Sequence, residues 1–288
     1  MIKQYSLAYL TVYGCAPPEM TYIAARTGYD FVSLRLIPMG VPGEKSYLPE
    51  DKEMISKTKA ALNETGVKVL DIELARIVDD VDPCSYIPAM EAAADLGAKH
   101  VISSAWTTDR NDRNFIIDRY AEICDLAKPL GLTVNLEFPT FSRLTNLQEA
   151  VDIVRAARRS NGGVFIDTLY FHYSSTGLDE LEALPREWFN FMHICDTSEE
   201  IPTSRKAMLH VARDERLYFG EGCINFTAIL GRLPPMPYSI ELPNIKRLKQ
   251  FGFEGHARRC LETAKQHLDN VKIGAEPVCH APSCSLSQ

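Results

Sequence analysis

Four side chains that can bind a metal ion or move a proton stand at the ends of four consecutive β-rich runs. Glu137 and Asp167 each end an apolar run, and His193 and Glu241 occupy corresponding places in the two runs that follow. In parallel α/β proteins the carboxyl ends of the strands carry the functional residues. We therefore expect these four side chains to converge on one point.

Three carboxylates and one imidazole form an oxygen-rich ligand set that suits Mn²⁺, Mg²⁺ or Co²⁺ in five- or six-coordinate geometry. Four protein ligands on an octahedral ion leave two positions open, which is room for a vicinal hydroxy-ketone. Such an ion polarises the carbonyl and stabilises an enediolate. If the strands close into a barrel, Glu137 and Glu241 approach its mouth from different sides. They are then the natural pair to remove and return the neighbouring carbon-bound proton.

Two other interpretations of this pattern are open. A carboxylate at a strand end can simply cap the next helix, whose N-terminus favours negative charge. Four such caps at corresponding places in four runs are a less economical explanation than one shared site. A catalytically inactive barrel that serves as a binding or sensing module is the second alternative, and the presence of all four candidate ligands argues against it.

The elements that must position these residues alternate regularly along the chain. Short β-rich runs and amphipathic segments predict eight parallel βα units, hence an α/β (β/α)8 TIM barrel. We expect residues 1–275 to form the catalytic barrel and residues 276–288 to be a flexible C-terminal tail. The segment Asp196–Gly222 is predicted to be a long irregular loop, and the last helix is predicted at about Phe253–Asn270.

Composition narrows the class of protein. The formal net charge is −7, without a run of lysine and arginine, so a nucleic-acid partner is not expected. No run approaches the ~18 apolar residues that span a bilayer, and the N-terminus lacks a signal-peptide pattern. The eight cysteines are scattered without C-x-x-C spacing, which indicates reduced thiols. We expect a cytoplasmic protein that has no membrane partner and acts on a small molecule.

Several further residues are candidates for substrate binding. Arg35 and Glu73 are placed at the ends of two early strands, where a structural ion pair and a substrate contact are equally reasonable. Trp106 can stack on a substrate or seal the core. Arg213 and Arg216 suit an anionic group, although the neighbouring acids favour a solvated charge run.

The order Glu, Asp, His, Glu, together with Gly220-Glu221-Gly222 and the run Asn225–Leu230, resembles the xylose isomerase-like TIM barrel superfamily over roughly Ser6–Leu268. This superfamily includes sugar isomerases, ketose 3-epimerases, related dehydratases and members described only as sugar phosphate isomerase/epimerase. The resemblance implies that Glu137, Asp167, His193 and Glu241 are metal ligands, that the substrate is a keto-sugar, a sugar phosphate or a related polyol, and that homo-oligomers are usual.

Departures from the family pattern bear on the substrate. Ketose 3-epimerases usually carry a histidine three residues after the strand-six Asp. This chain has Tyr170 there and His172 two places later, so either His172 substitutes or the contact is lost. Dehydroshikimate dehydratases carry a histidine where this chain has Pro139, which leaves a dehydratase of another cyclic keto-polyol, such as an inosose, as the alternative. Repair endonucleases need further metal ligands that this chain lacks at Glu73 and Tyr170.

Overall fold

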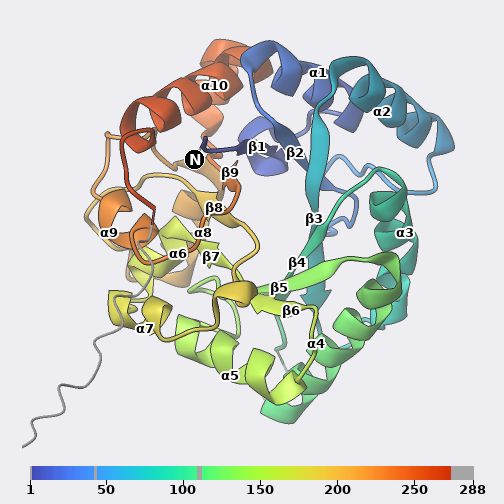
Figure 1. The fold of residues 1–288 in the computed structure, drawn as a ribbon, viewed down its shortest axis with the longest axis vertical. Helices are drawn as coiled ribbons and strands as arrows, with labels where there is room; N and C mark the ends of the chain where they lie inside the picture. The colour runs from blue at the N-terminus through green and yellow to red at the C-terminus, as the bar shows by residue number, and fades with distance from the viewer. Residues whose placement is uncertain (1, 42–43, 109–111, 274–288) are drawn as a thin grey trace, which may run out of the picture.

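A barrel of parallel strands lies inside a ring of helices in the computed structural model, which describes residues 2–41, 44–108 and 112–273 (Figure 1). The tail predicted for residues 276–288 lies outside these ranges. Each strand pairs in parallel with its neighbours in the order β6-β5-β4-β3-β2-β1-β9-β8-β7. The strands are β1 (Tyr5–Ala8), β2 (Phe31–Arg35), β3 (Lys68–Ile77), β4 (His100–Ala105), β5 (Thr133–Glu137), β6 (Gly162–Val164), β7 (Ile166–Asp167), β8 (Met192–Ile194) and β9 (Tyr238–Ile240).

The barrel closes through Phe165, which separates β6 from β7. β6 pairs with β5, and β7 pairs with β8. The backbone N–H of Phe165 donates to the carbonyl of Leu136 at 2.9 Å, so the two short strands occupy one strand position. The predicted (β/α)8 architecture is therefore confirmed.

The helices begin and end where local sequence signals predict. α1 starts at Pro17 and ends before Gly28, whose φ of 90° is the left-handed value that favours glycine at a helix C-terminus. At α5, the Asn146 side chain accepts from the N–H of Glu149. The helices are α1 (Pro17–Thr27), α2 (Lys52–Thr65), α3 (Ile87–Asp95), α4 (Arg113–Ala127), α5 (Leu147–Ala157), α6 (Thr168–Tyr173), α7 (Leu178–Glu182), α8 (Arg205–Asp214), α9 (Phe226–Leu230) and α10 (Ile245–Leu268).

One sequence prediction about the C-terminal third is wrong, and another is confirmed. Asp196–Gly222 is not irregular throughout, because it contains α8, which is capped by the Ser204 hydroxyl. This helix was not recognised in the sequence, because its many charged residues leave only a narrow apolar stripe. The last helix agrees with its prediction, because Gly252, with a φ of 67°, divides α10 into two helical parts and the second begins at Phe253. The first part, which begins at Ile245, was not foreseen from the sequence.

The core has two parts. The larger apolar cluster lies between the strands and the helices, and a smaller one fills the barrel interior. Phe165 and Phe191 of the smaller cluster meet the imidazole of His193 edge-on, with ring centroids 4.8 and 6.5 Å away. The smaller cluster consists of Leu70, Leu74, Ile102, Phe165 and Phe191.

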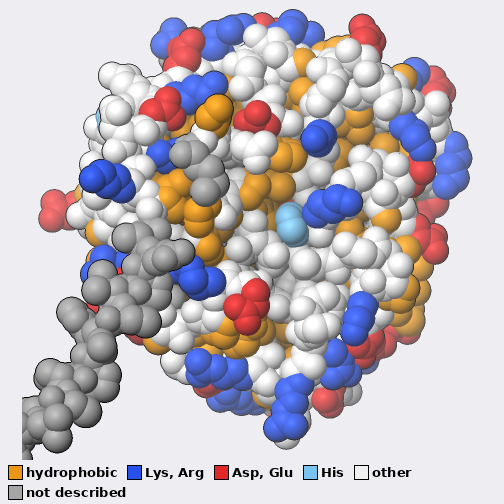
Figure 2. Space-filling model, viewed as in Figure 1, with side chains coloured by type: hydrophobic (Ala, Val, Ile, Leu, Met, Phe, Trp, Pro, Cys, Tyr) orange, Lys and Arg blue, Asp and Glu red, His pale blue; other side chains and the backbone are white. Residues whose placement is uncertain are grey.

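The surface and the thiols agree with the composition. Basic and acidic side chains are interspersed on the face shown in Figure 2. Within the described ranges, no helix has both the length and the apolar character that crossing a membrane requires. The six cysteines in these ranges are free thiols, and Cys279 and Cys284 lie outside them.

A turn built around Asp196 holds the loop after α8 against the barrel. The Asp196 carboxylate accepts from the N–H groups of Gly220, Gly222 and Ile224 at 3.0–3.1 Å. Its backbone pairs with that of Leu217. A Cβ at Gly222 would collide with the Asp196 carboxylate and the Thr197 carbonyl. Glycine at position 222 is therefore a steric requirement of this turn.

A buried polar network lies inside the barrel on β1, β2, β3 and β9. The Ser33 hydroxyl donates to Asp71 and is 2.8 Å from the Ser6 hydroxyl and 3.1 Å from that of Ser239. Asp71 is fully buried, and its second oxygen has no hydrogen-bond partner. Burial raises the pKa of Asp71 to about 8, against an ordinary value of 3.8.

This raised pKa predicts that Asp71 makes stability depend on pH. The folded protein holds a proton that the unfolded chain releases above about pH 4, so the stability contributed by this proton is lost as pH rises toward 8. Asp71→Asn removes the dependence. In urea denaturation of metal-free protein, the variant should gain on the order of 2 kcal/mol relative to wild type between pH 5 and pH 8. Asp118→Asn, an exposed control, should show no gain, and equal behaviour of the two variants would refute the assignment.

Candidate active site

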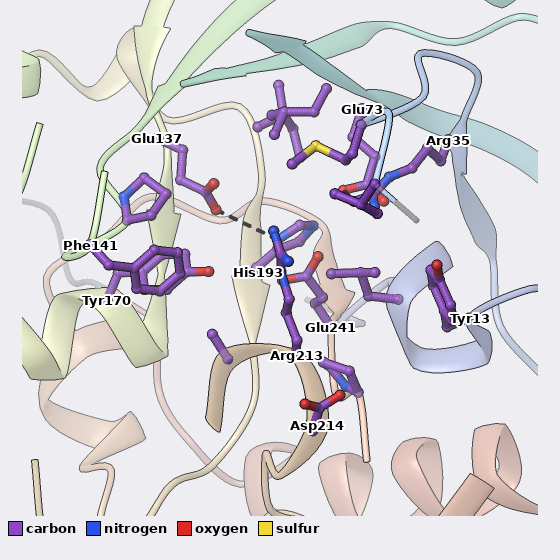
Figure 3. Close-up of a pocket in the computed structure, with 18 of the residues that line it drawn as sticks. Tyr13, Arg35, Glu73, Glu137, Phe141, Tyr170, His193, Arg213, Asp214 and Glu241 are labelled. Atoms are coloured by element: carbon purple, nitrogen blue, oxygen red, sulfur yellow. Dashed lines mark hydrogen bonds and ion pairs between the residues drawn. The ribbon is translucent and has the colours of Figure 1, made fainter. Parts of the chain in front are cut away.

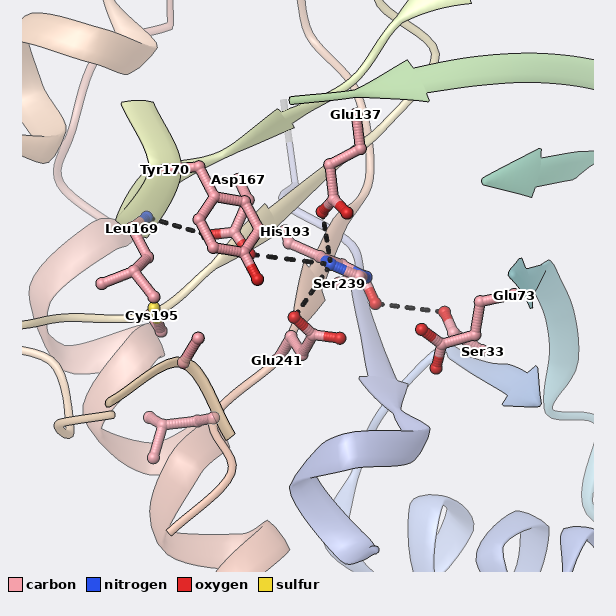
Figure 4. Close-up of polar contacts among 12 residues, drawn as sticks. Ser33, Glu73, Glu137, Asp167, Leu169, Tyr170, His193, Cys195, Ser239 and Glu241 are labelled. Carbon is pink, nitrogen blue, oxygen red and sulfur yellow. Dashed lines mark hydrogen bonds and ion pairs between the residues drawn. The ribbon is translucent and has the colours of Figure 1, made fainter. Parts of the chain in front are cut away.

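The four residues singled out in the sequence meet at the carboxyl ends of β5, β7, β8 and β9 (Figure 4). His193 Nδ1 lies 3.3 Å from a carboxylate oxygen of Glu241 and 4.0 Å from oxygens of Glu137 and Asp167. All four residues are buried. Three carboxyl groups thus surround one imidazole.

Strand register produces this convergence. Asp167 and His193 are direct partners in the pairing of β7 with β8. Glu137 is the last residue of β5, and Glu241 follows β9 directly, with its N–H donating to the carbonyl of Ile194 at 3.2 Å. Parallel pairing brings all four positions to the same rim.

Asp167 combines the two roles that the sequence left open. One carboxylate oxygen accepts from the N–H of Leu169 at 2.8 Å and caps α6. The other oxygen faces His193 and Arg216. Helix capping therefore fixes the orientation of Asp167 while one oxygen remains available at the centre of the site.

Arg216 occupies a place in the site that the sequence analysis did not foresee. Its guanidinium is fully buried and contacts oxygens of Asp167 at 2.7 Å and of Glu241 at 2.8 Å. It also stacks over the ring of Tyr170. The expectation of a solvated charge run is wrong for Arg216, because the Asp196–Leu217 backbone pair draws it inward. The apolar run that follows it, Leu217–Phe219, is the sequence signal for this return to the core.

Burial and mutual charge set the protonation of the metal-free site. Burial, together with Asp167 and Glu241, raises the pKa of Glu137 well above its ordinary value. Burial alone would lower the pKa of His193, but Glu241 and the other carboxylates raise it to about 10. Burial would raise the pKa of Glu241, but His193 and Arg216 outweigh it and lower the pKa to about 2.

The residues present fit a divalent cation. Neither ring nitrogen of His193 has a hydrogen-bond partner, although the side chain is buried. Ligand atoms of Glu137, Asp167 and His193 all lie within 4.8 Å of one another. Glu241 stands next to this group but is turned toward Arg216 as well. A carboxylate-rich set with one imidazole suits a hard or borderline ion.

A pocket opens directly above the four residues (Figure 3). Of the residues proposed for substrate binding, Arg35, Glu73, Trp106 and Arg213 line it. Arg35 forms an ion pair with Glu73 at 3.0 Å, so both interpretations of this pair stay open. Glu73 lies within β3 rather than at its end, because the strand continues to Ile77.

His172 does not line the pocket, and its expected substitution for the family histidine is not supported. It lies on α6 and its Nε2 is 3.6 Å from the thiol of Cys223. Tyr170 lines the pocket instead, and its hydroxyl accepts from Arg216 at 3.4 Å. Because helix α6 starts at once after Asp167, residues three and five positions later cannot face the same way.

The buried arginine yields a prediction about stability. Arg216→Ala leaves Asp167 and Glu241 facing each other without a compensating charge, which should lower the free energy of unfolding by about 3–5 kcal/mol. The measurement is urea denaturation in EDTA and again with excess Mn²⁺, where the loss should be smaller. Arg213→Ala, at a half-buried position in the pocket, is the control and should change stability by less than about 0.5 kcal/mol. A small loss for Arg216→Ala in EDTA would contradict the charge-balance assignment.

Curated relatives share part of this chain. The inosose isomerase of Bacillus subtilis (strain 168) is 24% identical over 184 residues, which cover 62% of this chain and 64% of that protein. The inosose isomerase of Halalkalibacterium halodurans is 23% identical over 256 residues, covering 83% and 86%. The chain thus matches slightly less than two thirds of the length of the first of these relatives.

Solved structures show the same fold. The IolI protein, crystallised with a bound zinc atom, superposes with a TM-score of 0.77 at 19% identity, covering 93% of this chain and 99% of that one. The D-allulose 3-epimerase from Methylomonas sp. in complex with D-allulose gives a TM-score of 0.68 at 16% identity, covering 92% and 97%. The profile of the xylose isomerase-like TIM barrel family matches residues 22–263. The chain therefore belongs to the xylose isomerase-like TIM barrel family.

Proposed function

We propose that this protein is a divalent-metal-dependent isomerase or epimerase that removes a proton next to a carbonyl of a small polyhydroxylated or related hydroxy-ketone substrate. The observation that carries the proposal is the cluster of three buried carboxyl groups around an imidazole without hydrogen-bond partners, at the floor of an accessible pocket. The inosose isomerases among the relatives and the zinc in the IolI structure support an enzyme of this class.

Glu137, Asp167, His193 and Glu241 are the proposed ligands, and Mn²⁺, Mg²⁺, Co²⁺ and Zn²⁺ are the candidate ions. An ion held by these four residues would supply Lewis-acid activation of the substrate carbonyl. Arg216 holds Asp167 and Glu241 in place from behind, so these carboxylates do not need the ion to stay oriented.

Glu137 and Glu241 are the proposed pair for proton removal and return. They approach the centre from opposite sides of His193, one from β5 and one from the end of β9 (Figure 4). Two carboxyl groups on opposite sides allow a proton to leave one face of the substrate carbon and another to arrive on the other face. The apolar ring of Phe165 behind His193 keeps the floor of the site away from bulk water.

Metal loading should release protons. In the metal-free protein the pKa of about 10 keeps His193 protonated at pH 7, and the raised pKa of Glu137 favours its protonated form, so both groups lose protons on becoming ligands. Titration calorimetry with Mn²⁺ at pH 7, in two buffers of different ionisation enthalpy, should show about one to two protons released per ion. Affinity should rise with pH. Release of no proton would contradict the protonation assigned to the site.

Glu137→Gln tests the proposed role of Glu137 in proton transfer. Removing one member of the proton-transfer pair should reduce deuterium incorporation from deuterated water into the substrate by about 10²–10⁴-fold. The assay incubates metal-loaded protein with D-allulose, an inosose and simpler hydroxy-ketones. Mass spectrometry of the recovered substrate measures the deuterium that has been incorporated. Metal affinity should also fall, measured separately by calorimetry.

Glu187→Gln, at an exposed position, is the matched control and should retain full exchange. Undiminished exchange in Glu137→Gln would refute the assigned role. Growth of an enone absorbance would replace isomerisation by the dehydratase alternative, since elimination begins with the same proton removal.

A further inference from the structure

The pocket above the site is polar at its floor and apolar on its walls. The floor contains Glu137, Glu241, His193, Arg35 and Glu73. The walls are formed mainly by aliphatic and aromatic side chains from the loop after β1, the loop after β2, the loops after β4 and β5, and the start of α10. Those that matter most here are Leu10, Met39, Trp106, Phe141, Ile245 and Leu248.

Three polar side chains in the walls, those of Trp106, Asn244 and Asp214, are already engaged within the protein. The indole N–H of Trp106 donates to Ser104 at 2.7 Å. The side chain of Asn244 donates to the Arg216 carbonyl and accepts from the N–H of Arg247. Asp214 is paired with His210. These three groups are committed to the fold, so they offer little to hydroxyls on the body of a substrate. Arg213, Tyr13 and Tyr170 also bring polar atoms to the lining, but most of the remaining wall side chains are apolar.

Unsatisfied polar atoms occur at the floor. Arg35 Nε and Glu73 Oε1 are buried and have no hydrogen-bond partner, and both residues line the pocket. They present one donor and one acceptor beside the carboxylate cluster (Figure 3). One substrate hydroxyl would satisfy both atoms, because a hydroxyl can donate and accept.

The contrast between a polar floor and apolar walls determines which part of a ligand can be polar. A hydroxyl pressed against an apolar wall loses its water without gaining a partner, which disfavours binding. A fully hydroxylated sugar or cyclitol would place several hydroxyls there. A methylene in the same place gains from leaving water.

We propose that the substrate is an amphipathic hydroxy-ketone with a polar head and an apolar body. The carbonyl and its neighbouring hydroxyl form the head at the carboxylate cluster, that hydroxyl lies against Arg35 and Glu73, and the remaining carbon skeleton packs against the walls. The role of the head rests on the proposed function, whereas the apolar body rests on the wall residues alone.

A matched set of probes tests the polarity. L-Erythrulose and 1-hydroxybutan-2-one share a four-carbon hydroxy-ketone chain and differ only in two hydroxyls, and 1-hydroxyhexan-2-one adds two methylenes. Dissociation constants are measured by calorimetry on the full chain loaded with Mn²⁺. Each methylene should tighten binding about three- to fourfold, so the hexanone should bind about tenfold more tightly than the butanone. L-Erythrulose should bind more weakly than the butanone.

Tighter binding of L-erythrulose than of 1-hydroxybutan-2-one, or no gain from the added methylenes, would overturn the inference. Deuterium incorporation into the same probes is measured in parallel and tests the proposed function. An apolar preference without exchange would refute the function and leave the inference standing. Deuterium exchange combined with tighter binding of L-erythrulose would support the proposed function and refute the inference of an apolar substrate body.

Substitution of a wall residue tests whether the preference for apolar ligands arises at the pocket walls. Leu248→Asn, at a half-buried position on α10, should weaken binding of 1-hydroxyhexan-2-one at least threefold and leave 1-hydroxypropan-2-one unchanged. Leu126→Asn, half-buried on α4 and outside the pocket lining, is the control and should change neither. Met39→Gln serves the same purpose if Leu248→Asn does not fold. Wild-type selectivity in the folded wall variant would contradict the proposal.

Discussion

The charge balance around Arg216 is the constraint on which the rest of the site depends. Three carboxyl groups buried within one small volume repel one another strongly, and burial penalises each charge further. In the metal-free protein the raised pKa values of Glu137 and His193 favour a proton on each, and this state leaves two carboxylates, which the imidazolium and the guanidinium of Arg216 balance. A divalent ion that replaces the two protons leaves the formal charge unchanged. The fold therefore tolerates both states.

The parts of this arrangement that local sequence patterns determine could be predicted. The alternation of β-rich runs and helices gave the barrel, and the position of a charged residue at the end of each late strand gave Glu137, Asp167, His193 and Glu241. Strand pairing then brings them together without further information, because all parallel strands end at one rim.

What could not be predicted depends on contacts between distant segments. Arg216 lies in a run of charges, and only the pairing of Leu217 with Asp196 shows that its side chain turns inward. His172 and Tyr170 differ by two positions on α6, and the direction of that helix decides which of them reaches the pocket. Glu73 was misplaced because β3 runs three residues beyond the point where its apolar pattern weakens. Chemistry lies on strands and selectivity on loops and helix ends, so the second is harder to infer from sequence.

The turn at Gly220–Gly222 has a consequence for how distant relatives of this chain are judged. Both glycine N–H groups bind the carboxylate of Asp196, and a side chain at Gly222 has no room beside it. The motif is thus a property of the scaffold, imposed by packing on the far side of Arg216 from the reacting centre. A homologue that had lost Glu137 would still need the same turn to fold. Gly-Glu-Gly therefore identifies the architecture, and a barrel that has given up catalysis would carry the motif unchanged.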